Sequence, residues 1–539
     1  MKKSVILFVL CLILLATSLL VGCSGGDVSA GTTTTTIYFV PDEEIDQIAS
    51  EGLEFFSNGD GTCQVLSIGT CTDTELVIPS TSPEGEAVVG ILKWALDECD
   101  QITSITMPST VVTLGEGALA YCDSLTTINI GRNVEYIGNF CFSGCKSLKS
   151  VVIPNGVAAM GNGVFSMCES LESVSIPATV GSIGSSPFSL CESLVNVTVD
   201  ENNSNYVFES GALYSKDKTW LIQYLVSNTE KSFEIPEGVE AIGDSAVFSC
   251  RNLESVTIPG SVTDIGKEAF YGCNNISSIT FGNGLKNIGE YAFLYCASLE
   301  DLVFPEGLLS IGNLAFSKCE KLKSVVLPDS LTTISWGVFQ ECQALESVEL
   351  GKGVTTIGEE SFMGCKSLKN VTIPDSVTTI ENNAFRECSS LTSITIPDSV
   401  TTLGAYVFQD CEKLETVVIG KGVASISEKA FLSCYNLKSI AFSDNVTSIG
   451  NGAFSNCQGL VRVVISDSVL TIGDGAFSGC SSITRITIGS SVTNIGGYAF
   501  SGCSSLTAIN FKGTEKEWHA IKKIYSWDID TGAYMLYCN

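Results

Sequence analysis

The chain has 539 residues and a formal net charge of −30 at pH 7. Only 16% of its residues are charged, whereas about a quarter is usual for globular proteins. This balance excludes the Lys/Arg surface that nucleic acids require, and it excludes membrane attachment through a basic patch. We therefore expect no nucleic-acid partner, and we expect solubility to depend on the acidic excess.

The N-terminus has the features of an export signal. An apolar run at Val5–Ala16 follows Lys2 and Lys3. Because this run is too short to cross a bilayer, it fits the apolar core of a secretory signal. The sequence LVGC, which ends at Cys23, resembles the lipobox of bacterial lipoproteins. The resemblance implies a signal peptide at 1–22 and lipidation of Cys23, and ordinary secretion without a lipid is the alternative.

Residues 23–36 are rich in Gly, Ser and Thr and have almost no apolar content. Such a composition cannot build a core, and it is typical of a flexible linker. The segment is therefore predicted to be a tether between the lipid and the folded part of the chain.

Residues 37–98 are a weak form of the repeat that fills the rest of the chain. Leu76–Pro79 has the pattern of a short strand closed by proline, and Ala95 precedes Cys99 with the spacing of the later repeats. Terminal repeats are atypical because one of their faces meets water, so this region is predicted to be an N-terminal cap. Within it, Cys63 and Cys71 could form a disulfide in an exported protein, and two free thiols are the alternative.

Residues 99–512 are built from a 23-residue repeat, which reads CSSLTSITIPDSVTTLGAYVFQD at Cys388–Asp410. Phe occupies the position of Phe408 at every step from Phe270 to Phe500. A fixed period of this length indicates stacked structural repeats. The cysteine recurs 17 times in register, at Cys99, Cys122, Cys145, Cys168, Cys191, Cys250, Cys273, Cys296, Cys319, Cys342, Cys365, Cys388, Cys411, Cys434, Cys457, Cys480 and Cys503.

Within one repeat, the apolar spacing predicts a short strand. Residues two apart on a strand share a face, so Ile394 and Ile396 should point inward while Ser393 and Thr395 point outward. The proline that follows has no amide hydrogen to donate and ends the strand. Gly404 is expected to supply a tight corner. The fold class is therefore predicted to be a solenoid with a parallel β-sheet on one face, mostly strand and irregular structure with little helix.

The registered cysteines are predicted to be free, packed thiols. Stacked coils place equivalent Cα atoms about 4.7–4.9 Å apart, but parallel Cβ vectors leave the Cβ atoms farther apart than disulfides favour. A free cysteine packs as a small buried hydrophobe.

The repeat is interrupted by an insertion at about 200–235, where 59 residues separate Cys191 from Cys250. Two apolar runs around a charged turn predict a β-hairpin there, which could be either a protruding binding element or a widened coil. Asp200, Asn202 and Ser204 resemble the start of a calcium loop. The later loop positions do not match, so no calcium site is expected.

Residues 513–539 follow the last repeat. Thr514 and Glu517 form the pattern of a capping box, and Trp518, Ile521 and Tyr525 follow at helical spacing. This segment is predicted to be a C-terminal cap with a short helix, and a helix offered to a partner is the alternative.

Residues suited to catalysis or metal binding are scarce. His519 is the only histidine, and we expect it to be a solvated surface residue. Cys141 and Cys145 are the only cysteines with zinc-site spacing. There is no phosphate-binding or dinucleotide-binding glycine motif. We therefore expect no enzyme activity, no cofactor and no metal.

The pattern C-x-x-L-x-x-V-x-I-P-x-x-V-x-x-I-G-x-x-A-F over residues 70–512 resembles the BspA-type leucine-rich repeats, also called the Treponema pallidum class. The GT-x-x-x-W-x-x-I pattern at 513–521 resembles the ending of that family. The resemblance implies a cell-surface protein that adheres to host matrix proteins or to other microbes.

The outward face of the strands is the natural binding surface of a solenoid. We expect a monomer that binds other proteins or glycans there and is lipid-anchored at the bacterial cell surface, in the outer membrane if the cell has one. The alternatives are a structural envelope protein without a host ligand and a protein that captures surface glycans. The candidate face residues are Ser255, Thr257, Ser278, Thr280, Asp301, Ser347, Glu349, Asn370, Ser393, Thr395, Arg462 and Arg485.

Overall fold

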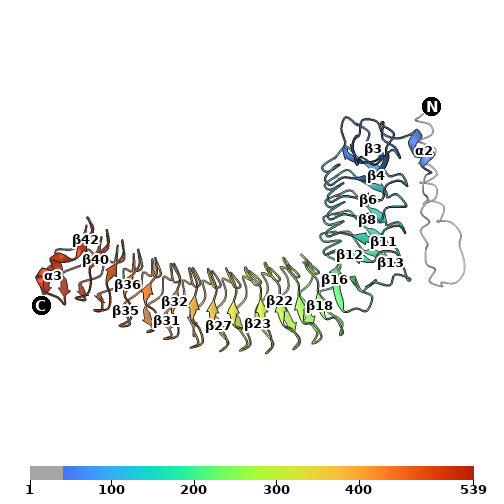
Figure 1. Cartoon of the computed structure of the whole chain (residues 1–539). Coiled ribbons are helices and arrows are strands. Elements are labelled where there is room, and N and C mark those ends of the chain that lie inside the picture. Colours follow the sequence, from blue (N-terminus) through green and yellow to red (C-terminus); the bar gives the residue numbers. More distant parts are fainter. Residues whose placement is uncertain (1–40) are drawn as a thin grey trace. The chain divides into compact units, whose positions relative to one another are not determined.

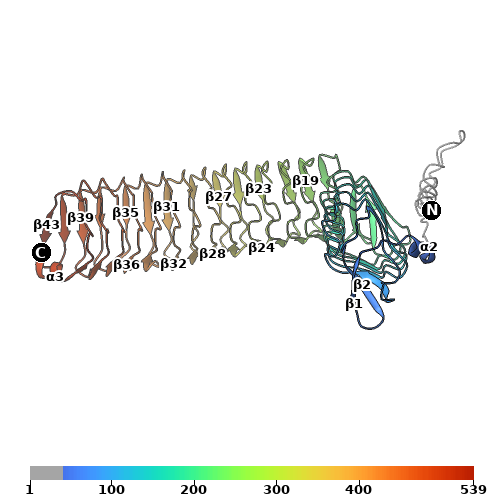
Figure 2. The same cartoon turned by 90° about the horizontal axis from the view of Figure 1, so that it is seen from above.

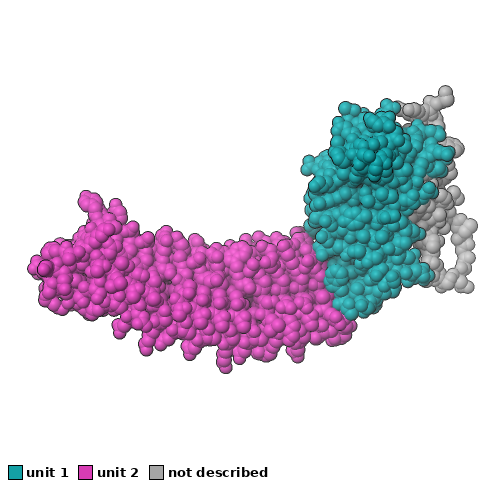
Figure 3. Space-filling model, in the orientation of Figure 1, with its two compact units in different colours: residues 1–228 teal, residues 229–539 magenta. Residues whose placement is uncertain are grey.

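A computed structural model describes residues 41–539. The chain forms two compact units, unit 1 up to Asn228 and unit 2 from Thr229 to Asn539 (Figure 3). The predicted signal peptide, the tether and Cys23 lie outside the described residues, as do residues 37–40 of the predicted cap.

Unit 1 begins with α2 (Asp42–Gln47), β1 (Glu54–Ser57) and β2 (Thr62–Ser67), and β1 pairs antiparallel with β2. The helix is tied to the coils that follow it, because Asp46 accepts a hydrogen bond from the Ser80 amide at 2.7 Å and Asp42 accepts one from the Ser109 amide at 2.8 Å. The predicted strand before Pro79 is β3 (Glu75–Val77). Cys63 and Cys71 are both free and buried, so the disulfide alternative is not what the structure contains.

The remaining coils of unit 1 place their strands in two parallel rows, which we call the first and the second sheet. Hydrogen-bonded pairing is interrupted once along the first row, and β1 and β2 extend the second. The first sheet contains β3, β5 (Ser104–Thr106), β7 (Thr127–Asn129), β9 (Ser150–Val152), β11 (Ser173–Ile176) and β13 (Asn196–Val199). The second contains β4 (Ala87–Ile91), β6 (Thr113–Leu114), β8 (Tyr136–Ile137), β10 (Ala159–Met160) and β12 (Ser182–Ile183).

Unit 2 repeats this plan, and Figure 2 shows its two rows of strands on different sides of the coils. Hydrogen-bonded pairing is interrupted three times along the first row and twice along the second. The first sheet contains β17 (Ser232–Glu234), β19 (Ser255–Ile258), β21 (Ser278–Phe281), β23 (Asp301–Val303), β25 (Ser324–Val326), β27 (Ser347–Glu349), β29 (Asn370–Val371), β31 (Ser393–Ile396), β33 (Thr416–Ile419), β35 (Ser439–Ala441), β37 (Arg462–Val464), β39 (Arg485–Ile488), β41 (Ala508–Phe511) and β43 (Met535–Cys538). The second contains β18 (Ala241–Ile242), β20 (Asp264–Ile265), β22 (Asn287–Ile288), β24 (Ser310–Ile311), β26 (Thr333–Ile334), β28 (Thr356–Ile357), β30 (Thr379–Ile380), β32 (Thr402–Leu403), β34 (Ser425–Ile426), β36 (Ser448–Ile449), β38 (Thr471–Ile472), β40 (Asn494–Ile495) and β42 (Lys522–Lys523).

These strands confirm the predicted parallel solenoid (Figure 1). In β31, Ile394 and Ile396 are buried while Ser393 and Thr395 are exposed, which is the predicted alternation. The two-residue strands of the second sheet were not predicted as strands, because a pair such as Thr402–Leu403 of β32 is too short to show a period of two.

The third side of each coil bends through two residues in the left-handed region, such as Tyr406 (φ 58°) and Asp410 (φ 59°). Their amides, with that of Phe408 between them, donate to carbonyls of the next coil at 2.8–3.0 Å. Gly404, which was predicted to supply a tight corner, lies between β32 and this turn, but its φ is not in the left-handed region. A Cβ on Gly404 would lie 2.4 Å from the backbone nitrogen of Asn382, so the glycine is needed because two coils approach closely there.

Phenylalanine rings form a column inside unit 2. Between Phe362 and Phe500, successive ring centroids lie 5.2–5.5 Å apart with interplanar angles of 3–13°. The rings are fully buried, so each coil completes its core only with the ring of the next.

The registered cysteines form a second internal column of free thiols, as predicted. Fifteen of them donate the S–H group to a backbone carbonyl of the preceding coil, 26 residues earlier, at 2.9–3.5 Å. Cys411, for example, donates to Phe385. A cysteine at this position therefore both fills space and satisfies a buried carbonyl.

The insertion contains the predicted hairpin. β15 (Ala212–Ser215) and β16 (Trp220–Tyr224) pair antiparallel around the charged turn, and β14 (Tyr206–Glu209) adds a third strand. Asp200 accepts the Asn202 amide at 2.9 Å and so closes a local turn.

The C-terminal helix is α3 (Glu515–Ala520), and the predicted capping box between Thr514 and Glu517 is present. Trp518 and Ile521 are buried, but the predicted third member of the stripe, Tyr525, is 93% exposed because the helix ends at Ala520. The chain then adds strand β42 beside β40 and strand β43 beside β41, so one more coil follows the last regular repeat.

Candidate functional site

The candidate face residues lie on the outward side of the first sheet of unit 2. We call the outward side chains of this sheet the interaction face. Ser255 is half-buried, and the other eleven candidate residues are exposed. Neighbouring coils present them in register, as shown by the pairs Ser255↔Ser278 and Ser347↔Asn370. The face is thus a set of regular rows.

Charged side chains along the rim of this face are paired between coils. Lys323 contacts Glu300 at 2.7 Å, and Lys369 contacts Glu346 at 2.6 Å. In each pair, the hydrogen bond from the lysine and then its charge lower the pKa of the carboxyl. Because these groups are solvent-exposed, their pairing adds little stability, but it does neutralise the rim.

A strip of apolar side chains crosses the face near the C-terminal end of unit 2. Val418 is 50% exposed and Val464 is 56% exposed, and the exposed Ala441 lies between them on β35. These three residues occupy outward-facing strand positions that the repeat pattern predicts, but the sequence analysis did not name Ala441 or Val464 as candidates. Two exposed valines and an exposed alanine on three adjacent strands suit contact with apolar groups of a partner.

Arg462 and Arg485 stand beside this strip, directly opposite each other on β37 and β39. Both are exposed, and within residues 41–539 neither guanidinium forms an ion pair. Like charges opposite each other on adjacent strands are destabilising. In a chain with 59 acidic residues against 29 basic ones, local stability therefore does not explain the pair.

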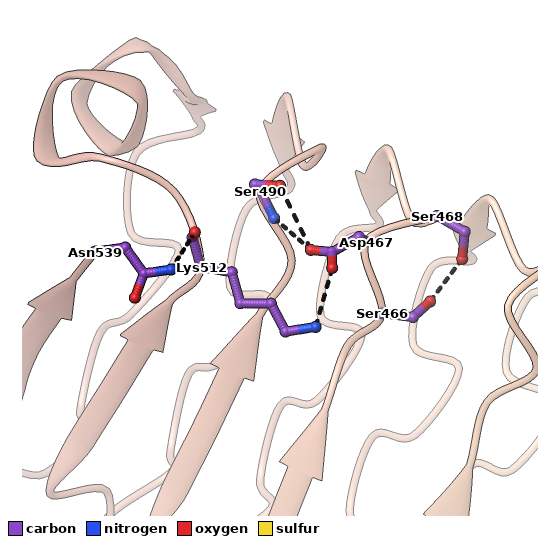
Figure 4. A network of polar contacts seen from close by, with 6 residues as sticks. All are labelled: Ser466, Asp467, Ser468, Ser490, Lys512 and Asn539. Atoms are coloured by element: carbon purple, nitrogen blue, oxygen red, sulfur yellow. Dashed lines mark hydrogen bonds and ion pairs between the residues drawn. The ribbon is translucent and has the colours of Figure 1, made fainter.

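A carboxylate that follows β37 is already engaged elsewhere (Figure 4). Asp467 accepts the Ser490 amide at 2.9 Å and contacts Lys512 at 3.1 Å. The backbone hydrogen bond from Ser490, and then the contact with Lys512, lower the pKa of Asp467. Ser466 and Ser468 share a hydrogen bond of 2.6 Å, and Asn539 donates to the Lys512 carbonyl at 2.6 Å. This network joins the ends of three consecutive strands, β37, β39 and β41.

We call Arg462, Arg485, Val418, Ala441 and Val464 the arginine–valine patch. Its cationic pair and apolar strip lie side by side on a flat sheet surface. Such a surface suits a protein partner that carries carboxylates next to apolar side chains.

The remaining candidates for chemistry are separated from this face. His519 is on the surface with its Nε2 3.8 Å from Glu515. Cys141 and Cys145 are buried, and the described part of the chain holds no group of three or more metal-ligating side chains. Burial raises the pKa of Cys99 to about 11 and that of Cys122 to about 12, so these thiols stay protonated and unreactive at neutral pH.

From residue 41 onward, none of the helices has both the length and the apolar character to cross a membrane.

Comparison with known proteins places the repeats in a described class. The model of the BspA type leucine-rich repeat region matches residues 90–215, 224–346, 332–461 and 424–523. No curated protein matches the chain.

Several solved structures are similar. A leucine-rich repeat protein from Bacteroides ovatus is 25% identical, with 90% of this chain and 98% of that chain covered and a TM-score of 0.36. A leucine-rich repeat protein from Eubacterium ventriosum is 24% identical, with 76% and 93% covered and a TM-score of 0.41. A leucine rich cell surface protein from Faecalibacterium prausnitzii is 24% identical, with 88% and 96% covered and a TM-score of 0.29.

Proposed function

Because the chain belongs to the BspA type leucine-rich repeat family, whose repeats serve protein–protein interaction, we propose that it is a bacterial adhesin that binds partner proteins through the interaction face. The partners are proteins of a host matrix or of another microbial surface.

The observation that carries this proposal is the arginine–valine patch. Arg462 and Arg485 repel each other on adjacent strands, and a partner carboxylate placed between them removes that repulsion. Val418 and Val464 offer apolar area that a partner can take out of water.

The rest of the interaction face supplies weaker contacts. Its serine and threonine rows, such as Ser393 and Thr395, can donate and accept hydrogen bonds but hold little apolar area. Repeated contacts of this kind raise the overall affinity when several are made at once.

We further propose that Cys23 carries lipid after removal of residues 1–22, which anchors the protein at the cell surface. Two or three acyl chains make a stable anchor, since each buried CH₂ contributes about 0.8 kcal/mol. Residues 23–36 then hold the solenoid away from the bilayer by about 20 Å on average, the size of a flexible linker of this length. Labelling of cells with a radioactive fatty acid should mark the native protein and not a Cys23→Ala variant.

The binding experiment uses the lipid-free chain from residue 24 onward on immobilised fibronectin, fibrinogen and partner-cell surface extracts. The double variant R462S/R485S gives both positions the serine that other coils carry there. We expect it to lose about tenfold or more in affinity for a protein that the native chain binds, with a weaker salt dependence.

The matched control is S393A/T395A, which changes two side chains of the same face outside the patch and should reduce affinity less than twofold, in the range of ordinary surface changes. Equal binding by R462S/R485S and the native chain would refute the role of the patch. Absence of binding to every protein surface would refute adhesion itself.

A further inference from the structure

Three aromatic side chains stand on the third side of unit 1, one from each of three consecutive coils, with Trp94 and Phe140 at the first left-handed position of their coils and Tyr121 at the second. Trp94, Tyr121 and Phe140 have φ angles of 56°, 57° and 55°. They remain 41%, 43% and 41% exposed. We call these three residues the aromatic ledge.

Each ring of the ledge lies over a glycine of the next coil. A Cβ on Gly117 would come within 2.1 Å of the Trp94 ring, and one on Gly144 within 2.4 Å of the Tyr121 ring. Gly163 has the same relation to Phe140, at 2.5 Å. The glycines therefore let the rings lie against the backbone on one side and leave the other side to solvent.

Two tyrosines at these positions in unit 2, Tyr295 and Tyr406, are arranged differently. Lys318 places its ammonium 5.1 Å from the centre of the Tyr295 ring, and Lys429 lies 5.2 Å from that of Tyr406. These lysines come from the next coil, where the aromatic ledge has glycine. In unit 1 the next coil has glycine there, so no cationic side chain from that position lies on the rings of Trp94, Tyr121 and Phe140.

Stability does not account for the ledge. Bulky residues in the left-handed region are strained, and other coils place glycine there, as at Gly337 and Gly475. A half-exposed ring gains only part of the burial that would offset this strain. Strained, exposed aromatic residues on three adjacent coils thus point to a ligand.

Polar side chains with fixed orientation flank the rings. Asn139 accepts the Asn162 amide at 2.8 Å, and Asn162 accepts the Ser185 amide at 2.8 Å. These bonds fix the side-chain oxygens of Asn139 and Asn162, and they leave the side-chain NH₂ groups of both residues as hydrogen-bond donors. Lys93 and Glu116 are exposed at the equivalent positions of the two coils before Asn139.

We propose that the aromatic ledge binds a glycan chain, with the apolar faces of its pyranose rings stacked on Trp94, Tyr121 and Phe140. Sugar rings present C–H groups on their faces and hydroxyls at their edges, which matches flat aromatic rings bordered by amide, amine and carboxylate groups. Trp94 and Phe140 occupy the same position two coils apart, about 9.6 Å, a step similar to the length of two sugar units in an extended chain, and Tyr121 stands on the coil between them. The ledge is in unit 1 and does not depend on the interaction face of unit 2.

The test is electrophoresis of the chain from residue 24 onward through gels that contain a soluble polysaccharide. The probes are laminarin, hydroxyethylcellulose and gastric mucin, with a gel lacking polymer as the reference. At least one probe should retard the native protein, and the triple variant W94A/Y121A/F140A should lose about tenfold or more of that affinity.

The control variant is Y295A/Y406A, which removes aromatic rings that lysines cover and should keep the native retardation. Circular dichroism of each variant establishes that the solenoid is folded. In addition, the probe that retards the protein should shift its tryptophan fluorescence, and W94F should abolish that shift while retaining measurable binding.

Failure of all three polymers to retard the native chain overturns the proposal, as does unchanged retardation of the folded triple variant. Retardation by mucin that survives enzymatic removal of its glycans would show a protein ligand instead, which also overturns it. R462S/R485S should leave this binding unchanged, so the outcome is independent of the adhesion experiment.

Discussion

The substitution Phe385→Ala tests whether stacked coils depend on each other. Phe385 is fully buried between Phe362 and Phe408, with ring centroids 5.3 and 5.5 Å away. Truncation of a buried Phe to Ala costs about 3–5 kcal/mol. Because the ring has an aromatic neighbour on both sides, each worth about 0.5–1.5 kcal/mol beyond burial, we expect the upper part of that range.

Native-state hydrogen exchange on the full repeat region measures this loss of stability coil by coil. The method is valid even if the whole chain does not unfold in a single step. Amides of the coils that contain Phe362, Phe385 and Phe408 should lose about 4–5 kcal/mol of protection, with smaller losses in more distant coils. The control is Val418→Ala on the interaction face, with an expected change within about 0.5 kcal/mol. A loss below about 1 kcal/mol in Phe385→Ala, or a loss spread evenly over unit 2, would refute nearest-neighbour coupling.

Three further predictions concern single features of the coils. Gly404→Ala should destabilise its coil by about 1–3 kcal/mol in the same exchange experiment, whereas Gly260→Ala, where a Cβ meets open space, should have almost no effect. Thr514→Ala should lower stability near α3 by about 0.5–2 kcal/mol through loss of the cap, and Thr514→Ser should restore it. Burial raises the pKa of Cys122 to about 12. The stabilisation of the folded state by this thiol should therefore be complete below about pH 8.5, where unfolded thiols are still protonated, and should decrease at higher pH. We expect the melting temperature to drop between pH 7 and pH 10, and to drop by less in Cys122→Ala.

The sequence was sufficient to predict those features that repeat in every coil. The alternation at Ile394 and Ile396 and the register of Phe408 and Cys388 follow from a period that recurs many times, so errors at one coil are corrected by the others. The exposure of the candidate face residues follows from the same alternation.

Features that depend on contacts between neighbouring coils could not be predicted from the repeat pattern. Gly404 avoids a clash with the backbone at Asn382, a contact that no pattern within one repeat contains. Ser335, Glu381 and Ser427 replace this glycine, and each lies between coils that keep it. The arginine–valine patch and the aromatic ledge are likewise formed across coils, from positions whose residue types vary.

The C-terminal cap shows a second limit of prediction from the sequence. Trp518, Ile521 and Tyr525 fit a helical stripe, but Ile521 already has extended backbone angles and α3 ends after six residues. The pairing of β42 with β40 stops the helix there, because the next coil needs a strand at that point. Tertiary pairing has overridden local helical spacing.

The thiol of each coil in unit 2 from Cys273 to Cys503 finds its carbonyl at one constant separation of 26 residues along the chain. Deletion or duplication of a block of 23 residues by recombination between similar gene segments therefore rejoins donors and acceptors that already fit one another. A block that is not a whole number of coils leaves a carbonyl unsatisfied and a thiol out of line. Proteins of this construction can thus become longer or shorter by whole coils without disturbing the bonds inside the coils that remain.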